Sequence, residues 1–102
     1  MEYTSQVSGD TKTYILSGQI NFKDDKKFAA LQMTIAEDRN TTGCVLDLSA
    51  ISFIDSSGLG MLLTLRDLAE KYGNQITLRK PQEKVMRVFR ACKFDTLFCI
   101  ED

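Results

Sequence analysis

Residues 47–60 read DLSAISFIDSSGLG. The run that leads into them, Cys44–Leu48, is short and mostly apolar, which is typical of a strand covered on both faces. After them, Ser57–Tyr72 has apolar residues at helical spacing, and Gly73 suits the left-handed position that commonly ends a helix. We therefore predict a central strand, a turn at Asp55-Ser56-Ser57-Gly58, and a helix.

The residues before this stretch predict a hairpin and an amphipathic helix. Tyr3–Val7 and Thr13–Ser17 are rich in β-formers and flank the turn-prone Ser8-Gly9-Asp10. Asp24–Arg39 follows with helical periodicity, and Asp24 is its expected N-cap. The apolar residues at helical spacing in this segment are Phe28, Leu31, Met33 and Ile35.

The residues after it predict two more strands and a last helix. Gln75–Arg79 reads as a strand, Pro81 as the start of a helix and Leu97–Ile100 as a short final strand. One face of that helix is expected to carry Val85, Val88, Phe89 and Cys92. Alternating strands and helices after a hairpin predict an α/β or α+β sandwich, a mixed sheet with helices packed on it, in one domain over residues 1–102.

Composition restricts the classes of function. The 102 residues carry a formal charge of −1, and with no histidine the chain lacks histidine-dependent triads and general bases, so we expect no enzyme. Three scattered cysteines do not make a zinc site, and we read Cys44, Cys92 and Cys99 as small buried hydrophobes. We expect no metal, cofactor, nucleic acid or membrane insertion, and a cytoplasmic protein.

Residues 47–60 also resemble the signature of STAS domains, in particular bacterial anti-sigma factor antagonists. Residues 16–20, 73–78 and 85–98 are similar to other parts of that family, so the resemblance covers nearly the whole chain. It implies a partner-switching cycle in which the unmodified protein binds a GHKL-type serine kinase that is also an anti-sigma factor. Phosphorylation abolishes binding and a PP2C-like phosphatase restores it. By direct match the acceptor is Ser56, with Ser57 as second choice.

Two positions depart from the family pattern. The bend at Cys92-Lys93-Phe94 lacks the glycine that the family often has, so a residue with a side chain must adopt any positive φ there. Asn21 stands where the family often has Asp, which removes a charge beside the expected partner surface.

The start of the predicted helix also has a physical reason to be a switch. Backbone N–H groups without helical partners and the helix dipole favour an anion there, so the free protein can tolerate a phosphate on Ser56. A docked partner would meet a large group and about −1.5 to −2 charges. We therefore predict a switch that blocks a surface with little refolding. The alternative is that Ser56 or Ser57 is only an N-cap.

A helical wheel separates two apolar groups on this helix. The core stripe comprises Met61, Leu62, Leu65, Leu68, Ala69 and Tyr72. Leu59 and Leu63 point elsewhere and share a strip with Ser56, Asp67 and Glu70. We predict that this strip binds the kinase, together with Asn21, Asp55, Ser57 and Gly58. The alternative is that the two leucines lie under a loop.

Other functions fit less well. A receiver domain would use Asp55 but needs an acidic pair after an early strand, which is missing after Ile15-Leu16. A nucleophilic Ser56 has no histidine to activate it. The basic residues between Arg79 and Lys93 read as a solvated face, and the alternative is that they dock on an acidic partner. The nearest alternative is a STAS scaffold subunit of a stress-sensing or membrane transporter complex.

Overall fold

The computed structural model describes residues 1–38 and 41–102. In chain order its elements are β1 (Glu2–Ser8), β2 (Thr11–Ile20), the 3₁₀ turn η1 (Phe22–Asp24), α1 (Asp25–Glu37), β3 (Gly43–Ile54), α2 (Ser56–Lys71), β4 (Gln75–Arg79), α3 (Glu83–Ala91), the 3₁₀ turn η2 (Phe94–Thr96) and β5 (Cys99–Glu101). The predicted order of strands and helices is confirmed.

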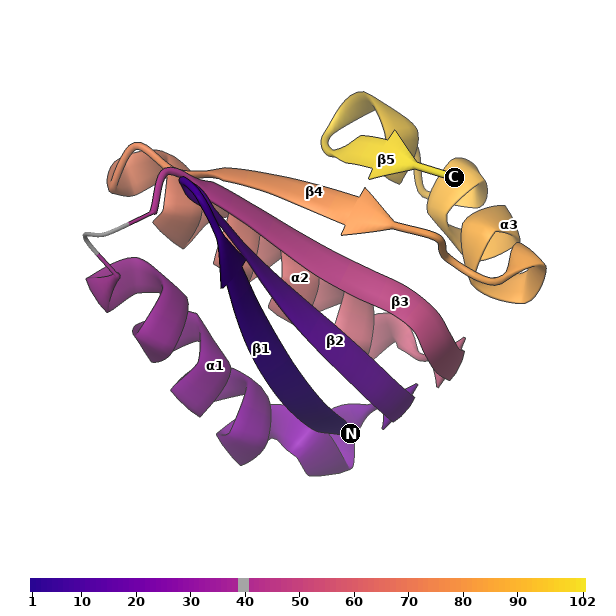
Figure 1. Cartoon of the computed structure of the whole chain (residues 1–102). Coiled ribbons are helices and arrows are strands. Elements are labelled where there is room, and N and C mark those ends of the chain that lie inside the picture. The colour runs from indigo at the N-terminus through magenta and orange to yellow at the C-terminus, as the bar shows by residue number, and fades with distance from the viewer. Residues whose placement is uncertain (39–40) are drawn as a thin grey trace.

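The strands form one mixed sheet in the order β1-β2-β3-β4-β5, with β3 in the middle as predicted. β1 and β2 are antiparallel and form the expected hairpin, whereas each later pair is parallel. Parallel neighbours need a crossover, and α1, α2 and α3 each supply one. Figure 1 shows α2 behind the sheet, α1 at the left of the view and α3 beside β5.

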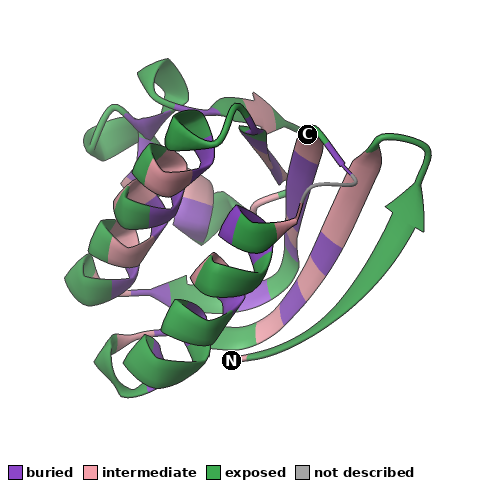
Figure 2. Ribbon diagram, turned by 90° about the vertical axis from the view of Figure 1, so that its left-hand side faces the viewer, coloured by how far each residue is buried: buried purple, intermediate pink, exposed green. Residues whose placement is uncertain are grey.

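The core lies between the sheet and its helices. Strand side chains alternate between faces, so Tyr14 and Leu16 of β2 and Leu46 and Leu48 of β3 turn inward and are buried. The helices contribute Phe28, Leu31, Ile35, Leu62, Leu65, Ala69, Val85 and Phe89 to the same cluster. In Figure 2 these helices lie on one side of the sheet, and β1 is exposed along its length.

The first half of β3 is covered on both faces, as its apolar run predicts, but the two faces are covered differently. In the described residues α1 and α2 lie on one face only (Figure 1). Val45 points to the other face and is nevertheless buried, because Thr13 and Thr77 flank it in the register. A buried strand can therefore read as continuously apolar even where one face of the sheet has no helix layer.

The start of α1 differs from the prediction. Asp24 makes no side-chain cap bond to α1; its carboxylate accepts from the Asn21 N–H at 3.0 Å and from the Met1 ammonium at 2.9 Å. The capping side chain belongs to Asn21, which precedes the 3₁₀ turn η1 and accepts a hydrogen bond from the Lys23 N–H at 2.9 Å. Burial raises the pKa of Asp24, but these bonds outweigh it and lower the pKa overall. The predicted end at Arg39 lies outside the described residues, and α1 ends at Glu37.

Two other helix boundaries depend on backbone conformation. Gly73 follows α2 in the left-handed conformation, with φ +78°, as predicted for a glycine at this position. The Asn74 N–H then donates to the Ala69 carbonyl at 2.7 Å. Lys93 takes up the left-handed conformation after α3, with φ +60°, in the bend that lacks the expected glycine. Pro81 does not start α3, which begins at Glu83 after the cap residue Gln82.

Several side chains predicted in the core are exposed. Met33 and Tyr72 lie on the solvent side of their helices. Cys92 and Cys99 are also exposed, so the prediction of buried cysteines holds only for Cys44, whose burial raises the pKa of the thiol to about 12. The final strand begins at Cys99 and not at Leu97, because the N–H groups of Leu97 and Phe98 both donate to the Phe94 carbonyl in a turn that follows η2.

Candidate functional site

The candidate site lies at the carboxyl ends of two neighbouring parallel strands. Ile20 of β2 pairs with Ile54 of β3, so the residues that follow both strands emerge at the same edge of the sheet. The Asp55 N–H donates to the Ile20 carbonyl at 3.2 Å and extends this pairing by one residue. Polar groups after such strands commonly converge into a binding site.

The second half of β3 reaches the site through two irregularities. Ile15 pairs with Asp47 but Ser17 pairs with Ala50, and a second shift follows Gly18. Asp47 holds the first bulge, because its carboxylate accepts from the Ser49 N–H at 2.9 Å and the Ser49 hydroxyl at 2.7 Å. Bulges bend a strand and redirect its side chains. The Asp47-x-Ser49 part of the signature therefore has a structural role.

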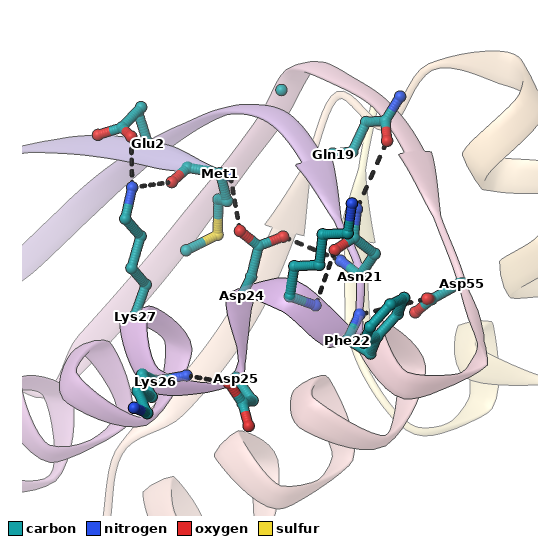
Figure 3. A network of polar contacts seen from close by, with 12 residues as sticks. Met1, Glu2, Gln19, Asn21, Phe22, Asp24, Asp25, Lys26, Lys27 and Asp55 are labelled. Carbon is teal, nitrogen blue, oxygen red and sulfur yellow. Dashed lines mark hydrogen bonds and ion pairs between the residues drawn. The ribbon is translucent and has the colours of Figure 1, made fainter.

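Asp55 joins the two connections at this edge. One carboxylate oxygen accepts from the Gly58 N–H at 2.8 Å, and the other accepts from the Phe22 N–H at 3.3 Å. Figure 3 shows the second contact beside the polar network of Asn21 and Asp24. The N-cap of α2 is thus Asp55, and the alternative that Ser56 or Ser57 caps the helix is wrong.

The two serines are the first residues of α2, and both are exposed. Within residues 1–38 and 41–102, no hydrogen bond is made by either hydroxyl or by the backbone N–H of either residue. Asp55 already occupies the next N–H group, that of Gly58. The Ser56 hydroxyl is therefore accessible, and two N–H groups beside it have no acceptor among the described residues.

Gly58 is placed by packing. It is buried, and a Cβ at this position would lie 2.6 Å from the Ile20 carbonyl oxygen and 2.7 Å from Ile54 Cγ1. Only glycine lets the first turn of α2 approach the strand ends this closely. Gly58 therefore has a structural role in holding the site together, and its contact with a partner stays a prediction.

The predicted docking strip on α2 is less apolar than expected. Leu59 and Leu63 are half-buried and pack against the core, which is neither full exposure nor the alternative position under a loop. Asp67 and Glu70 are exposed, and Arg66 pairs with them at 3.7 Å and 3.1 Å. The strip joins Ser56 to an acidic end without a continuous apolar surface.

Two aromatic residues that the sequence analysis did not single out as contacts lie beside Asp55. Phe22 is 65 % exposed and Phe53 is 52 % exposed. Phe53 lies within the signature stretch, and the burial of both Ile51 and Ile54, three residues apart, shows that strand alternation is broken around it. Phe22 directly follows Asn21, and the position of that capping residue indicates that Phe22 lies at the end of β2 beside the site.

The remaining described surface does not suggest bound metal. Among residues 1–38 and 41–102, no group of three or more acidic, cysteine or histidine side chains could hold an ion. A cleft of about 300 Å³ lies between the end of α2 and β4–β5. Its cation, Arg66, already donates to the Leu97 carbonyl at 2.7 Å and pairs with Glu70. No helix in the described part of the chain has the length and hydropathy to cross a membrane.

Comparison with known proteins agrees with this geometry. An anti-sigma factor antagonist from Mycobacterium paratuberculosis superposes with a TM-score of 0.76 at 22% identity, over 98% of this chain and 84% of that one. The anti-sigma factor antagonist SpoIIAA in its unphosphorylated form gives 0.73 at 20% identity, over 99% and 88%. The phosphorylated form of SpoIIAA from Bacillus gives 0.72 at 20% identity, over 97% and 90%. These likenesses establish the fold.

A curated relative that is locally similar to this chain is named for a transport system. The chain is 50% identical over 40 residues to the intermembrane phospholipid transport system binding protein MlaB of Escherichia coli, over 39% of this chain and 41% of MlaB. The match thus spans about two fifths of that relative. The sequence model of the STAS domain matches residues 2–102. The chain belongs to the STAS domain family.

Proposed function

We propose that this STAS domain is a cytoplasmic partner-switching regulator controlled by phosphorylation of Ser56. In its unmodified form it binds a GHKL-type serine kinase that is also an anti-sigma factor. The kinase phosphorylates Ser56 and is released, and a PP2C-like phosphatase returns the domain to its binding form. The chain itself performs no catalysis in this cycle.

The observation that carries the proposal is the position of Ser56. Its hydroxyl is exposed at the first residue of α2, and the Asp55 carboxylate next to it is fixed by two backbone N–H groups. A phosphate would place about −1.5 to −2 further charges beside that carboxylate. A partner that packs closely around the start of α2 would have to desolvate both anions, which strongly disfavours binding.

The free protein can hold the phosphate without refolding. The Ser56 and Ser57 N–H groups have no acceptor in the described residues, and the helix dipole favours an anion at this end. The likeness to SpoIIAA, solved in phosphorylated and unphosphorylated forms, supports a switch of this kind.

A second candidate is a structural subunit of a membrane transport complex. The local identity to MlaB, named as a binding protein of a phospholipid transport system, favours it. In that role the start of α2 would contact a partner permanently, and Ser56 would need no modification.

One experiment separates the two. Wild type, Ser56→Ala and Ser56→Asp are used to capture partners from the cytosol of the source cell, and phosphate on the wild type is mapped by mass spectrometry. The switch predicts that wild type and Ser56→Ala retain a GHKL-type kinase, that Ser56→Asp does not, and that Ser56 carries phosphate. Equal capture of a transporter subunit by all three, without phosphate, would establish the scaffold instead.

A further inference from the structure

An apolar groove runs alongside the candidate site. It has a volume of about 280 Å³ and lies between the end of β3 and α3. Its lining is Ser52, Phe53, Ile54, Lys84, Val85 and Val88. The groove exists because β4 pairs with β3 only as far as Asp47, which leaves the second half of β3 without a strand on that side.

A hydrogen bond fixes α3 against β3 next to the groove. The Gln82 side chain donates to the Ser49 carbonyl at 2.8 Å and fixes the beginning of α3 against the first bulge of β3. From there Val85 is buried in the core, whereas Val88 is only half-buried and Phe53 is half-exposed. The two half-covered side chains face the same space from opposite elements.

The groove and the Ser56 site form one surface. Phe53 lines the groove and precedes Ser56 by three residues, and the Phe22 N–H is bonded to Asp55 at 3.3 Å. A protein that reaches the Ser56 hydroxyl therefore comes into the immediate neighbourhood of both phenylalanines. Large exposed aromatic side chains of this kind are the usual anchors of protein interfaces.

The charge at the rim indicates what the partner carries. Lys84 is exposed at the groove, and among the described residues no carboxylate pairs with it, whereas Arg87 on the next turn pairs with Glu83 at 3.0 Å. An acidic residue beside an apolar one would complement this rim.

We propose that the kinase of the partner switch docks on this surface, with an apolar side chain in the groove between Phe53 and Val88 and a carboxylate on Lys84. This inference rests on the function proposed above and locates the partner on the β3–α3 side of Ser56. The surface differs from the α2 strip predicted from the sequence, because Leu59 and Leu63 do not line the groove.

The test measures the rate at which purified variants acquire phosphate on Ser56 in source-cell cytosol supplied with ATP. Phe53→Ala and Lys84→Glu are expected to slow labelling at least about tenfold, as anchor residues do. Met33→Ala and Lys26→Glu remove an exposed apolar side chain and reverse an exposed charge on α1, and should stay within about twofold of wild type.

Folding of each variant is checked by thermal unfolding. Should Phe53→Ala fold poorly, Lys84→Glu decides the question, because its side chain is exposed. If the wild type is labelled and Phe53→Ala, Lys84→Glu and both α1 controls are labelled at the same rate, the proposed docking surface is wrong. The proposed phosphorylation switch would not be affected by that result. No phosphate on wild type would overturn the switch, and the docking surface with it.

Discussion

The two halves of β3 perform different tasks on one continuous strand. Gly43–Asp47 pairs in regular register with β2 on one side and β4 on the other. Residues 48–54 pair with β2 alone, through two register shifts, and expose Ser49, Ala50, Ser52 and Phe53. Regular pairing on both sides makes the first half a core element. The loss of one neighbour and the two register shifts leave the second half exposed, and this is where we propose that the partner docks.

The largest effect is expected in the first half. Leu46 is completely buried in the core cluster, so Leu46→Ala should lower the free energy of unfolding by about 2–5 kcal/mol. Urea denaturation measures this change. Phe53→Ala in the second half is the comparison and should cost clearly less, because about half of its side chain is already exposed. Equal losses of unfolding free energy for Leu46→Ala and Phe53→Ala would contradict the assignment of the core role to the first half of β3.

The junction between β3 and α2 should be nearly as sensitive. Gly58→Ala forces a Cβ against the Ile20 carbonyl, and we expect a loss of about 1–3 kcal/mol in thermal or urea unfolding. Gly60, two residues further along the same helix, has open space around it, so Gly60→Ala should be neutral or stabilise by about 0.4–1 kcal/mol. Similar costs at both glycines would contradict the close approach.

A smaller effect is expected at the cap. Asp55→Ala removes the acceptor for the Gly58 and Phe22 N–H groups and should destabilise the domain by about 0.5–2 kcal/mol. Ser57→Ala is the matched control, and because its hydroxyl makes no bond within the described residues the change should stay within about 0.5 kcal/mol. If Ser57→Ala lowered the free energy of unfolding more than Asp55→Ala, Ser57 and not Asp55 would be the N-cap of α2.

The smallest effect concerns pH at the boundary between the halves. Burial raises the pKa of Asp47, but the hydrogen bonds from Ser49 outweigh it and lower the pKa below 3.8. The ionised carboxylate therefore stabilises the fold above about pH 4, and this contribution is lost as the pH falls through the lowered pKa. Asp47→Asn should be less stable than wild type near neutrality, and the difference should shrink in acid. Urea midpoints measured across this range would show a constant difference if Asp47 does not titrate in this way.

Much of the site was accessible from sequence because its parts are local. Asp55, Ser56 and Ser57 follow one another, so a strand, a turn and a helix start could be read from neighbouring residues, and the family signature added the switch hypothesis. The identity of the cap was missed, because both serines and Asp55 are good N-caps and only the bond to Gly58 separates them. The burial of Leu59 and Leu63 depends on the neighbouring elements, which a helical wheel does not include.

The amino-acid sequence by itself determined the order of elements, the hairpin, the central strand and the accessible serine at the start of α2. These depend on periodicity, turn residues and motif spacing within short segments. The tertiary structure decided that Asp47 holds a bulge, that Gly58 must lack a side chain, and that Phe53 and Lys84 of α3 line one groove. These features depend on how distant segments approach one another, which local residue patterns do not encode.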